Sequence, residues 1–389
     1  MIIVKAYKYK LKTNINIDQQ FSQIAGCCRF AYNYFLAQRI QEYRTDFVMP
    51  NYYVQAVQLP SLKEEYPWLK EVPSQTLQQT LKDLDQAYKN FFRRVKTGGV
   101  LGFPKFKKKG VHDSFRYPQG IKVEGSRIFL PKVGWVAFHR SRDIQGKIKN
   151  VTVSKSASGW YVSIQTEQDV ADATHTSTTP VGIDVGVKIF AALSNGTTYE
   201  PANSLRKLEK QLAKAQRNVT RKKKGSNNRK KQIKKLALLH EKIANTRMDY
   251  LHKASTDISK NHAVVVLEDL KVSNMSRSAK GTVDNPGKNV KAKAGLNKSI
   301  LDQGWSMFRN MIEYKLKYSG GELILVNPKY TSQTCSNCGH VSKDNRKTQS
   351  NFQCIECAHE LNADVNAAKN ILAVGLTVSA CGAAALAAQ

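Results

Sequence analysis

Acidic residues are scarce in this chain. Its 389 residues include 30 Asp or Glu against 61 Lys or Arg, which leaves a formal net charge of +31. Solubility needs far less charge, so the imbalance predicts a polyanionic partner. The charge is also concentrated, because residues 204–247 carry sixteen Lys or Arg and only two acids.

Long hydrophobic runs are also few. The length and the 41% hydrophobic content predict a globular protein of two or three domains and exclude global disorder. The first 13 residues alternate apolar with polar and contain four lysines, which indicates a strand and no signal peptide, so we expect a cytoplasmic protein. The apolar run 371–389 consists largely of small residues, and we expect a loosely ordered tail there, with no membrane anchor.

The seven cysteines lack the pattern of a disulfide framework, which favours a reducing compartment. Four of them follow the spacing Cys-x2-Cys-x15-Cys-x2-Cys at Cys335, Cys338, Cys354 and Cys357. This spacing predicts a four-cysteine zinc ribbon, with two disulfides as the alternative. Gly339 permits the left-handed turn that follows such a pair. Four thiolates close the coordination sphere, so the expected zinc ion is structural.

The first half of the chain predicts strands around a helical insertion. A strand covers residues 1–13, and the pattern is helical from about residue 17 to 92. Within it, residues 74–92 form an amphipathic helix whose apolar stripe is Leu77, Leu81, Leu84, Tyr88, Phe91 and Phe92. Strands resume at about residue 110 and continue to about 168, which suggests a small β barrel interrupted by helices.

The second half predicts an α/β domain of the ribonuclease H type. A polar segment ends at residue 180, and two apolar strands with an Asn195-Gly196 turn follow. The basic region forms a helical hairpin, and "HAVVVLEDL" is apolar on both faces, as a central parallel strand is. We expect a Gly/Lys-rich loop over residues 276–298, then a helix, then the buried strand "ELILVNP".

Three acidic residues occupy positions where the surrounding pattern predicts apolar core residues. Asp184 interrupts an apolar strand and Glu268 ends the run "VVVL", although an acid at a strand end is often only a turn former. Asp364 follows Asn362, which is a candidate helix N-cap. The positions on the Asp364 face of that helix are small or apolar, so the helix can lie close to a sheet: Ala367, Ala368 and Ile371. Three converging carboxylates suit two Mg²⁺ ions about 3.5–4 Å apart, which together cleave phosphodiesters.

The order "GIDVGVK", "VVVLEDL" and "NPKYTSQTCSNCG…CIEC…NADVNAAKNI" resembles the transposon-encoded TnpB (OrfB) proteins, which are relatives of compact type V CRISPR effectors. The match covers about residues 181–372. "FPKFKKKG…SFRYPQG" and the helix at 74–92 are similar to that family in a less distinctive way. Ala358 and Ala363 depart from the pattern, since glycine and arginine are common at these positions.

The resemblance implies an RNA-guided DNA endonuclease with a RuvC-type nuclease domain, a wedge-type β barrel, a helical recognition domain and a zinc ribbon. Asp184, Glu268 and Asp364 would hold two Mg²⁺ ions and perform catalysis, and the four cysteines would hold one Zn²⁺ ion. A guide RNA from the transposon end would direct cleavage of target DNA next to a short adjacent motif. The expected boundaries are 1–14 and 110–170 (barrel), 15–109 (recognition domain), 171–180 (linker), 181–332 and 360–375 (nuclease), 333–359 (ribbon) and 376–389 (tail).

Nucleic-acid contacts are expected on two surfaces. Basic residues at the hairpin and beside the phenylalanines would meet phosphates, and polar residues off the apolar stripe of the 74–92 helix would read base edges. The candidates are Gln75, Gln78, Gln79, Lys105, Lys107, Arg221, Lys222, Lys223 and Lys224.

Two other functions stay open at this point. One is an RNA-guided DNA-binding protein without cleavage, which the intact acids disfavour. The other is an RNA-independent transposase or RuvC-like resolvase. The chain has no His-hydrophobic-His motif, so we expect that strand joining belongs to a separate transposase of the same element.

Overall fold

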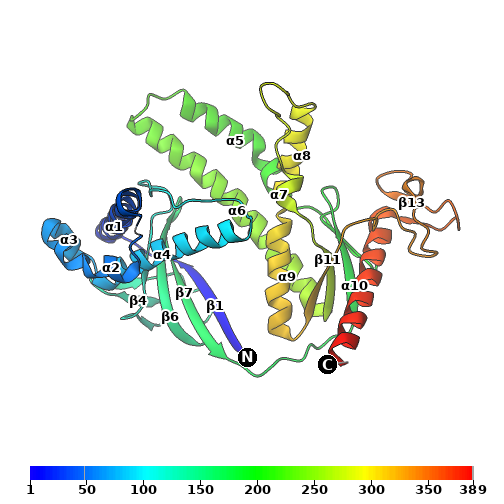
Figure 1. Cartoon of the computed structure of the whole chain (residues 1–389), viewed down its shortest axis with the longest axis horizontal. Coiled ribbons are helices and arrows are strands. Elements are labelled where there is room, and N and C mark those ends of the chain that lie inside the picture. The colour runs from blue at the N-terminus through cyan, green and yellow to red at the C-terminus, as the bar shows by residue number, and fades with distance from the viewer. Residues whose placement is uncertain (48, 388–389) are drawn as a thin grey trace. The chain divides into compact units, whose positions relative to one another are not determined.

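The computed structural model describes residues 1–47 and 49–387, with side chains described up to residue 377. The chain divides into two compact units, Met1–Ala171 and Asp172–Gln389 (Figure 1). The division falls inside the polar segment that ends at residue 180.

The strands of the first unit form two antiparallel sheets. One has the order β1-β7-β6-β2 and consists of β1 (Ile2–Lys10), β2 (Ser114–Tyr117), β6 (Lys147–Ser156) and β7 (Gly159–Asp169). The other contains β3 (Lys122–Glu124), β4 (Arg127–Leu130) and β5 (Gly134–Ala137). A bridge between Leu11 and Phe138 joins them. Among the described residues the predicted barrel is thus a pair of bridged sheets whose ladder does not close, because β3 to β5 pair with one another.

Helices separate β1 from β2, as the sequence predicts. They are α1 (Ile15–Asp46), α2 (Tyr52–Val57), α3 (Leu59–Glu65), the 3-10 helix η1 (Pro67–Glu71) and α4 (Ser74–Lys96). Helix α4 buries most of the predicted stripe against α1 and the inner faces of the sheets. Phe92 is 43% exposed, so the buried stripe ends before the helix does.

The second unit has a five-stranded mixed sheet with the order β10-β9-β8-β11-β12. Its strands are β8 (Pro180–Val185), β9 (Ala191–Leu193), β10 (Thr198–Tyr199), β11 (Val264–Glu268) and β12 (Glu322–Val326). The strands β8, β11 and β12 are parallel, and β9 and β10 are antiparallel additions at one edge. This is the predicted ribonuclease H arrangement, with the apolar strand β11 between the parallel strands β8 and β12.

Helices α5 (Ser204–Thr220) and α6 (Asn227–Asn261) form the predicted hairpin, and α7 (Val272–Met275), α8 (Val290–Gln303) and α9 (Trp305–Ser319) follow β11. The predicted loop 276–298 was too long, because α8 already begins at Val290. Lys, Ala and Leu in "VKAKAGLNK" are good helix formers, and the lysines were mistaken for a loop. Gly304, with a φ of 74°, separates α8 from α9.

Helices cover both faces of this sheet (Figure 1). Helices α6 and α9 pack on the face that presents Val265 and Leu267, and α10 (Ala363–Ala387) packs on the face that presents Val266. Between β12 and α10 lie the short elements η2 (Lys343–Asn345), β13 (Asn351–Gln353) and β14 (Glu360–Asn362). The predicted tail from residue 376 begins inside α10, and its side chains from 378 onward lie outside the described residues.

Within the part of the chain that the structure describes, no helix combines the length and the apolar character needed to cross a membrane.

Helix α10 approaches the sheet unusually closely at Gly182 of β8. A Cβ atom at this position would lie 2.2 Å from the backbone oxygen of Ala368 and 2.6 Å from the backbone nitrogen of Leu372. At Gly375 a Cβ would lie 2.4 Å from Cγ1 of Val266 in the neighbouring strand. Glycines on both surfaces, together with the alanines of α10, therefore let the backbones of helix and sheet meet.

We expect Gly182→Ala to lower the free energy of unfolding by about 1–3 kcal/mol or more. The added methyl group overlaps backbone atoms that cannot rotate away. Gly295→Ala in α8 is the matched control, since a Cβ there meets nothing within 4 Å. The control should gain up to about 1 kcal/mol from helix propensity. Chemical unfolding measures both, and equal stability of the Gly182→Ala and wild-type proteins would contradict the expectation.

Candidate active site and metal centre

Asp184 is the penultimate residue of β8, and Glu268 is the last residue of the neighbouring parallel strand β11. The register of β8 with β11 places them side by side, one step beyond the last paired residues. Side chains alternate between the two faces of a strand, and Asp184 follows Gly182 by two residues as Glu268 follows Val266. Both carboxylates therefore lie on the sheet face that α10 covers.

Asp364 lies in the first turn of α10. The side-chain oxygen of Asn362 accepts hydrogen bonds from the amides of Asp364 at 3.0 Å and Val365 at 3.3 Å, so the N-cap predicted for Asn362 is confirmed. An Asp364 carboxylate oxygen lies 3.3 Å from a guanidinium nitrogen of Arg346. This arginine was not predicted, since a lone cation in a basic chain carries no signal.

Electrostatics connects the three acids. Burial raises the pKa of Asp184 to about 7, and the negative charges of Glu268 and then Asp364 add to the increase, while Arg346 opposes it. The Asp184 carboxyl therefore senses both of the other charges.

Glu268 has a fixed orientation. The hydroxyl of Thr331 donates a 2.6 Å hydrogen bond to its carboxylate. Burial raises the pKa of Glu268, and this hydrogen bond lowers it in part. The next residue, Asp269, pairs with Lys271 at 2.6 Å and Arg309 at 2.8 Å. The two adjacent acids thus have separate surroundings.

The four predicted cysteines converge on one point. Their sulfur atoms all lie within 4.8 Å of one another, with 3.7 Å between Cys335 and Cys357 and 3.6 Å between Cys338 and Cys354. A disulfide needs about 2.05 Å. Four thiolates about 2.3 Å from one tetrahedral ion would be about 3.8 Å apart. The cluster thus has the spacing of a metal site, and its sulfur atoms lie too far apart for the alternative of two disulfides.

The backbone at each Cys-x-x-Cys pair turns in the same way. The amide of Cys335 donates to the carbonyl of His340 at 2.9 Å, and the amide of Cys354 donates to that of His359 at 3.0 Å. Gly339 has a φ of 77°, as predicted for the first turn, and Ala358 has a φ of 53° in the second. A residue with a side chain in this conformation costs about 1–2 kcal/mol, so the second turn is strained.

Buried asparagines join the cysteine cluster to the helix that carries Asp364. Asn366 accepts from the amide of Ser336 at 2.9 Å and donates to the carbonyl of Thr334 at 2.8 Å. Asn370 donates to the carbonyls of Thr331 and Thr334 at 2.9 and 2.6 Å. These roles were not predicted, although asparagine recurs every fourth residue in "NADVNAAKN", which places all three on one helix face.

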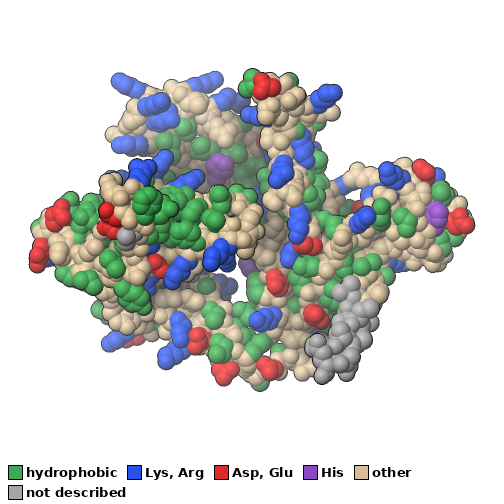
Figure 2. Space-filling model, in the orientation of Figure 1, with side chains coloured by type: hydrophobic (Ala, Val, Ile, Leu, Met, Phe, Trp, Pro, Cys, Tyr) green, Lys and Arg blue, Asp and Glu red, His purple; other side chains and the backbone are tan. Residues whose placement is uncertain are grey.

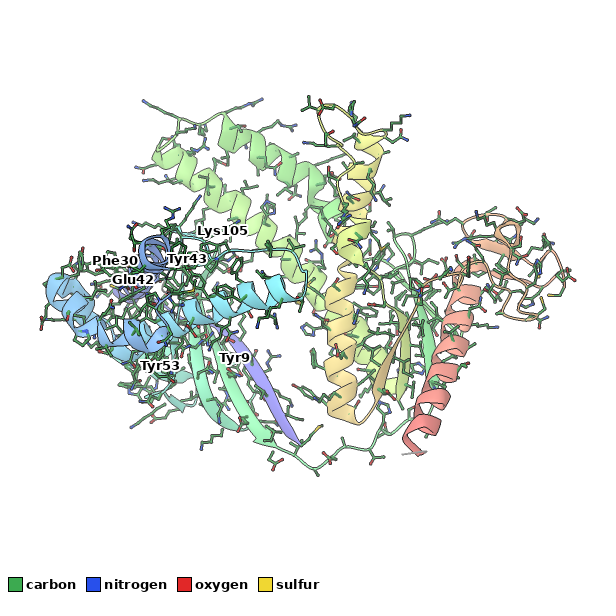
Figure 3. The ribbon with its side chains drawn as sticks, in the orientation of Figure 1. Tyr9, Phe30, Glu42, Tyr43, Tyr53 and Lys105 are labelled. Atoms are coloured by element: carbon green, nitrogen blue, oxygen red, sulfur yellow. The ribbon has the colours of Figure 1, made fainter. Side chains whose placement is uncertain are left out.

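The expected nucleic-acid contacts on α4 and the segment after it have mixed surroundings. Gln78 is exposed, Gln75 and Gln79 are half-buried, and Gln79 donates to Asp83 at 3.2 Å. Lys105, labelled in Figure 3, is exposed. The ammonium of Lys107 lies 4.1 Å from the ring centroid of Tyr32, so it is partly engaged within the protein.

The turn between α5 and α6 presents its cations to solvent. Arg221, Lys222, Lys223 and Lys224 are all exposed there. Figure 2 shows Lys and Arg side chains along this hairpin. The contact roles of these residues, like the catalytic roles of the three acids, stay predictions.

The raised pKa of Asp184 has a consequence for stability. Between about pH 4 and 7 the folded protein keeps a proton on this carboxyl that the unfolded chain releases, so the carboxyl destabilises the fold progressively as the pH rises. We expect Asp184→Asn to stabilise the magnesium-free protein more at pH 8 than at pH 5, by about 2–3 kcal/mol. Chemical unfolding at both pH values measures this, and an equal gain at both would contradict it.

Comparison with known families places these features in one group of proteins. A family profile named OrfB_IS605 and described as "Probable transposase" matches residues 163–279. A profile described as "Cas12f1-like, TNB domain" matches residues 305–371, and one described as "Helix-turn-helix domain" matches residues 1–46.

Relatives match along nearly the whole chain. A protein of Escherichia coli K12 named "Putative RNA-guided DNA endonuclease InsQ" is 51% identical over 97% of this chain and 94% of its own length. A Streptomyces pristinaespiralis protein named "Putative RNA-guided DNA endonuclease" is 33% identical over 98% and 91%. A solved Cas12f1-sgRNA-target DNA complex shares the fold, with a TM-score of 0.59 and 18% identity over 92% of this chain and 83% of that one. The chain belongs to the transposon-encoded TnpB (OrfB) family.

Proposed function

We propose that this protein is an RNA-guided DNA endonuclease of a transposable element that hydrolyses DNA phosphodiester bonds next to a short adjacent motif. The observation that carries the proposal is the convergence of Asp184, Glu268 and Asp364 at one edge of the sheet, where the pKa of Asp184 responds to both other charges. The names of the relatives support the guided activity.

The residues of the site would have different roles. Asp184, Glu268 and Asp364 would hold two Mg²⁺ ions, which when bound supply the charge that activates water and stabilises the leaving oxygen. Thr331 keeps Glu268 oriented through its hydrogen bond. Arg346 pairs with Asp364 and is 31% exposed, so its guanidinium can also meet a phosphate at the same edge.

The cysteine cluster would hold one structural zinc ion. Four thiolates leave no open coordination position, so this ion would not perform chemistry. Its effect would pass through the hydrogen bonds of Asn366 and Asn370, which connect the segment at residues 331–336 to α10. In this way the ribbon supports the position of Asp364.

The nucleic-acid partners would be a guide RNA from the transposon end and the target DNA in the cytoplasm. The exposed cations of the turn at 221–224 would meet phosphates without reading sequence, and base pairing with the guide would supply the specificity. The glutamines of α4 are candidates for reading the adjacent motif. Strand joining would belong to a separate transposase.

Cutting should require the acids, magnesium and RNA. Protein purified with its native flanking locus should carry RNA and cut matched duplex only with Mg²⁺. Asp184→Ala should abolish cutting and keep the RNA, because the change removes one metal ligand and none of the exposed cations. Asp249→Ala, an exposed acid on α6, is the control and should cut normally. Equal cutting by Asp184→Ala would refute the site, and cutting after complete removal of RNA would refute guidance.

Metal analysis should find about one zinc per chain, lost in Cys335→Ser. Ala358→Gly should slow zinc loss to a chelator about two- to fivefold, because glycine relieves the left-handed backbone at that turn. Gly339→Ala should speed the loss by a similar factor, because it introduces the same strain. If the two variants changed zinc loss in the same direction, the strain argument would be wrong.

A further inference from the structure

The loop between β12 and the first cysteine pair leaves the sheet beside the acid group. Val326, the last residue of β12, pairs with Glu268 in the register of the two parallel strands. Four residues later, Tyr330 precedes Thr331, whose hydroxyl holds the Glu268 carboxylate at 2.6 Å. The side chain of Asn370, on α10, donates to the carbonyl of Thr331 at 2.9 Å. Tyr330 therefore belongs to backbone that is fixed both to β11 and to α10.

The backbone of Tyr330 is strained and firmly held. Its φ is 67°, in the left-handed region where a glycine or an asparagine would fit better than a tyrosine. Its carbonyl accepts hydrogen bonds from the amides of Gln333 at 2.9 Å and Thr334 at 3.0 Å, and from the Thr334 hydroxyl at 2.9 Å. Strain that the surrounding structure holds in this way is concentrated at functional sites. The local fold thus gives no reason for a tyrosine, and its side chain becomes the feature to explain.

Burial does not explain the side chain either. Tyr330 is 51% exposed, and the ammonium of Lys329 lies 4.9 Å from the centroid of its ring. An exposed aromatic ring on a rigid backbone can stack on a nucleobase at a low entropic cost. An ammonium beside the ring can meet a phosphate of the same strand. The two neighbouring side chains thus have the character of a contact site for a nucleic-acid strand.

A base of a longer single strand fits this ring better than a free small molecule does. Small ligands bury most of their surface in a pocket, whereas half of Tyr330 is exposed. A base within a strand is also held through its phosphates, so one ring is enough to place it. In a duplex the faces of a base are covered by its neighbours, which makes an unstacked base the natural partner.

We propose that Tyr330 stacks on an unstacked base of the DNA strand that is being cut, next to the reacting phosphate, and so holds that strand in register at the acids. The inference rests on the proposed function, which places the phosphate at Asp184, Glu268 and Asp364. The hydrogen bond from Thr331 to Glu268 ties the position of the ring to that of the carboxylate. Tyr330 is a positioning residue, because it acts through the base.

Stacking can be tested without guide RNA and without a measurement of cutting. The probe is a five-nucleotide single-stranded DNA with one 5-iododeoxyuridine, a base that bonds under ultraviolet light to an aromatic ring in contact with it. Ca²⁺ replaces Mg²⁺ in the buffer, because it also takes carboxylate oxygens as ligands. We expect mass spectrometry to find the probe on Tyr330 of the wild type, and on the same position in Tyr330→Phe.

Competition shows whether the base or the phosphates bring the probe to Tyr330. An unlabelled intact strand should prevent the crosslink at a concentration about fivefold or more below that of an abasic strand with the same phosphates. Absence of a crosslink at Tyr330, or equal competition by the two strands, would overturn the proposal.

Guided cutting under single-turnover conditions gives a second and separate measurement. One abasic position beside the cut should slow the wild type, because no base is left there to stack. Tyr330→Asn should slow cutting of intact DNA about five- to hundredfold and should no longer respond to that abasic position, whereas Tyr330→Phe should behave like the wild type. Tyr43→Asn is the matched control and should change neither rate, since Tyr43 is a tyrosine of the first unit with 52% exposure (Figure 3). Absence of cutting by the wild type would instead contradict the proposed function, which the crosslink does not require.

A merely structural role for Tyr330 predicts a different result. Asparagine enters the left-handed region more readily than tyrosine, so we expect Tyr330→Asn to leave the denaturant midpoint unchanged or to raise it. A purely structural ring would lower the midpoint on removal and leave the ratio of intact to abasic rates as in the wild type. That pair of results would overturn the proposal.

Discussion

The close contact between α10 and β8 is the constraint on which the site depends. The carbonyl of Ala368 occupies the space that a side chain at residue 182 would need, so only glycine there allows the helix to lie on the strand. Asp364 is carried by the same helix, and Asp184 follows the glycine by two residues. The three carboxylates can meet because backbone touches backbone a few residues away.

The proximity of the three carboxylates opposes folding. Burial disfavours the charged form of Asp184, the charges of Glu268 and Asp364 add to this effect, and the raised pKa of Asp184 expresses the cost. The protein offsets it with contacts on each side of the group: the Thr331 hydroxyl on Glu268, the Arg346 guanidinium on Asp364, and the packing of α10 on the sheet. Sites that hold cations are commonly built in this way, with unfavourable charge held by the rest of the fold.

The cysteine cluster and the acid group are coupled through asparagine. Asn366 and Asn370 extend from α10 to the backbone that precedes and enters the first cysteine pair, and Asn345 joins the two cysteine turns by bonds to the carbonyl of His340 and the amide of Ile355. Amide side chains suit this task, since each can donate and accept at once. The ribbon is therefore part of the framework of the acid group as well as an insert in the domain.

The sequence by itself determined the order of elements, the ribonuclease H sheet and the spacing of the four cysteines, and it predicted the three acids as site residues, because periodicity, ligand spacing and the resemblance to a family are local in the chain. It misplaced the start of α8, because lysines hid a helical segment. Only the tertiary structure decided that Arg346, Thr331, Asn366 and Asn370 support the acids and that the loop of Tyr330 is fixed beside Glu268. These contacts join residues distant in sequence, and neither composition nor spacing encodes which distant groups will meet.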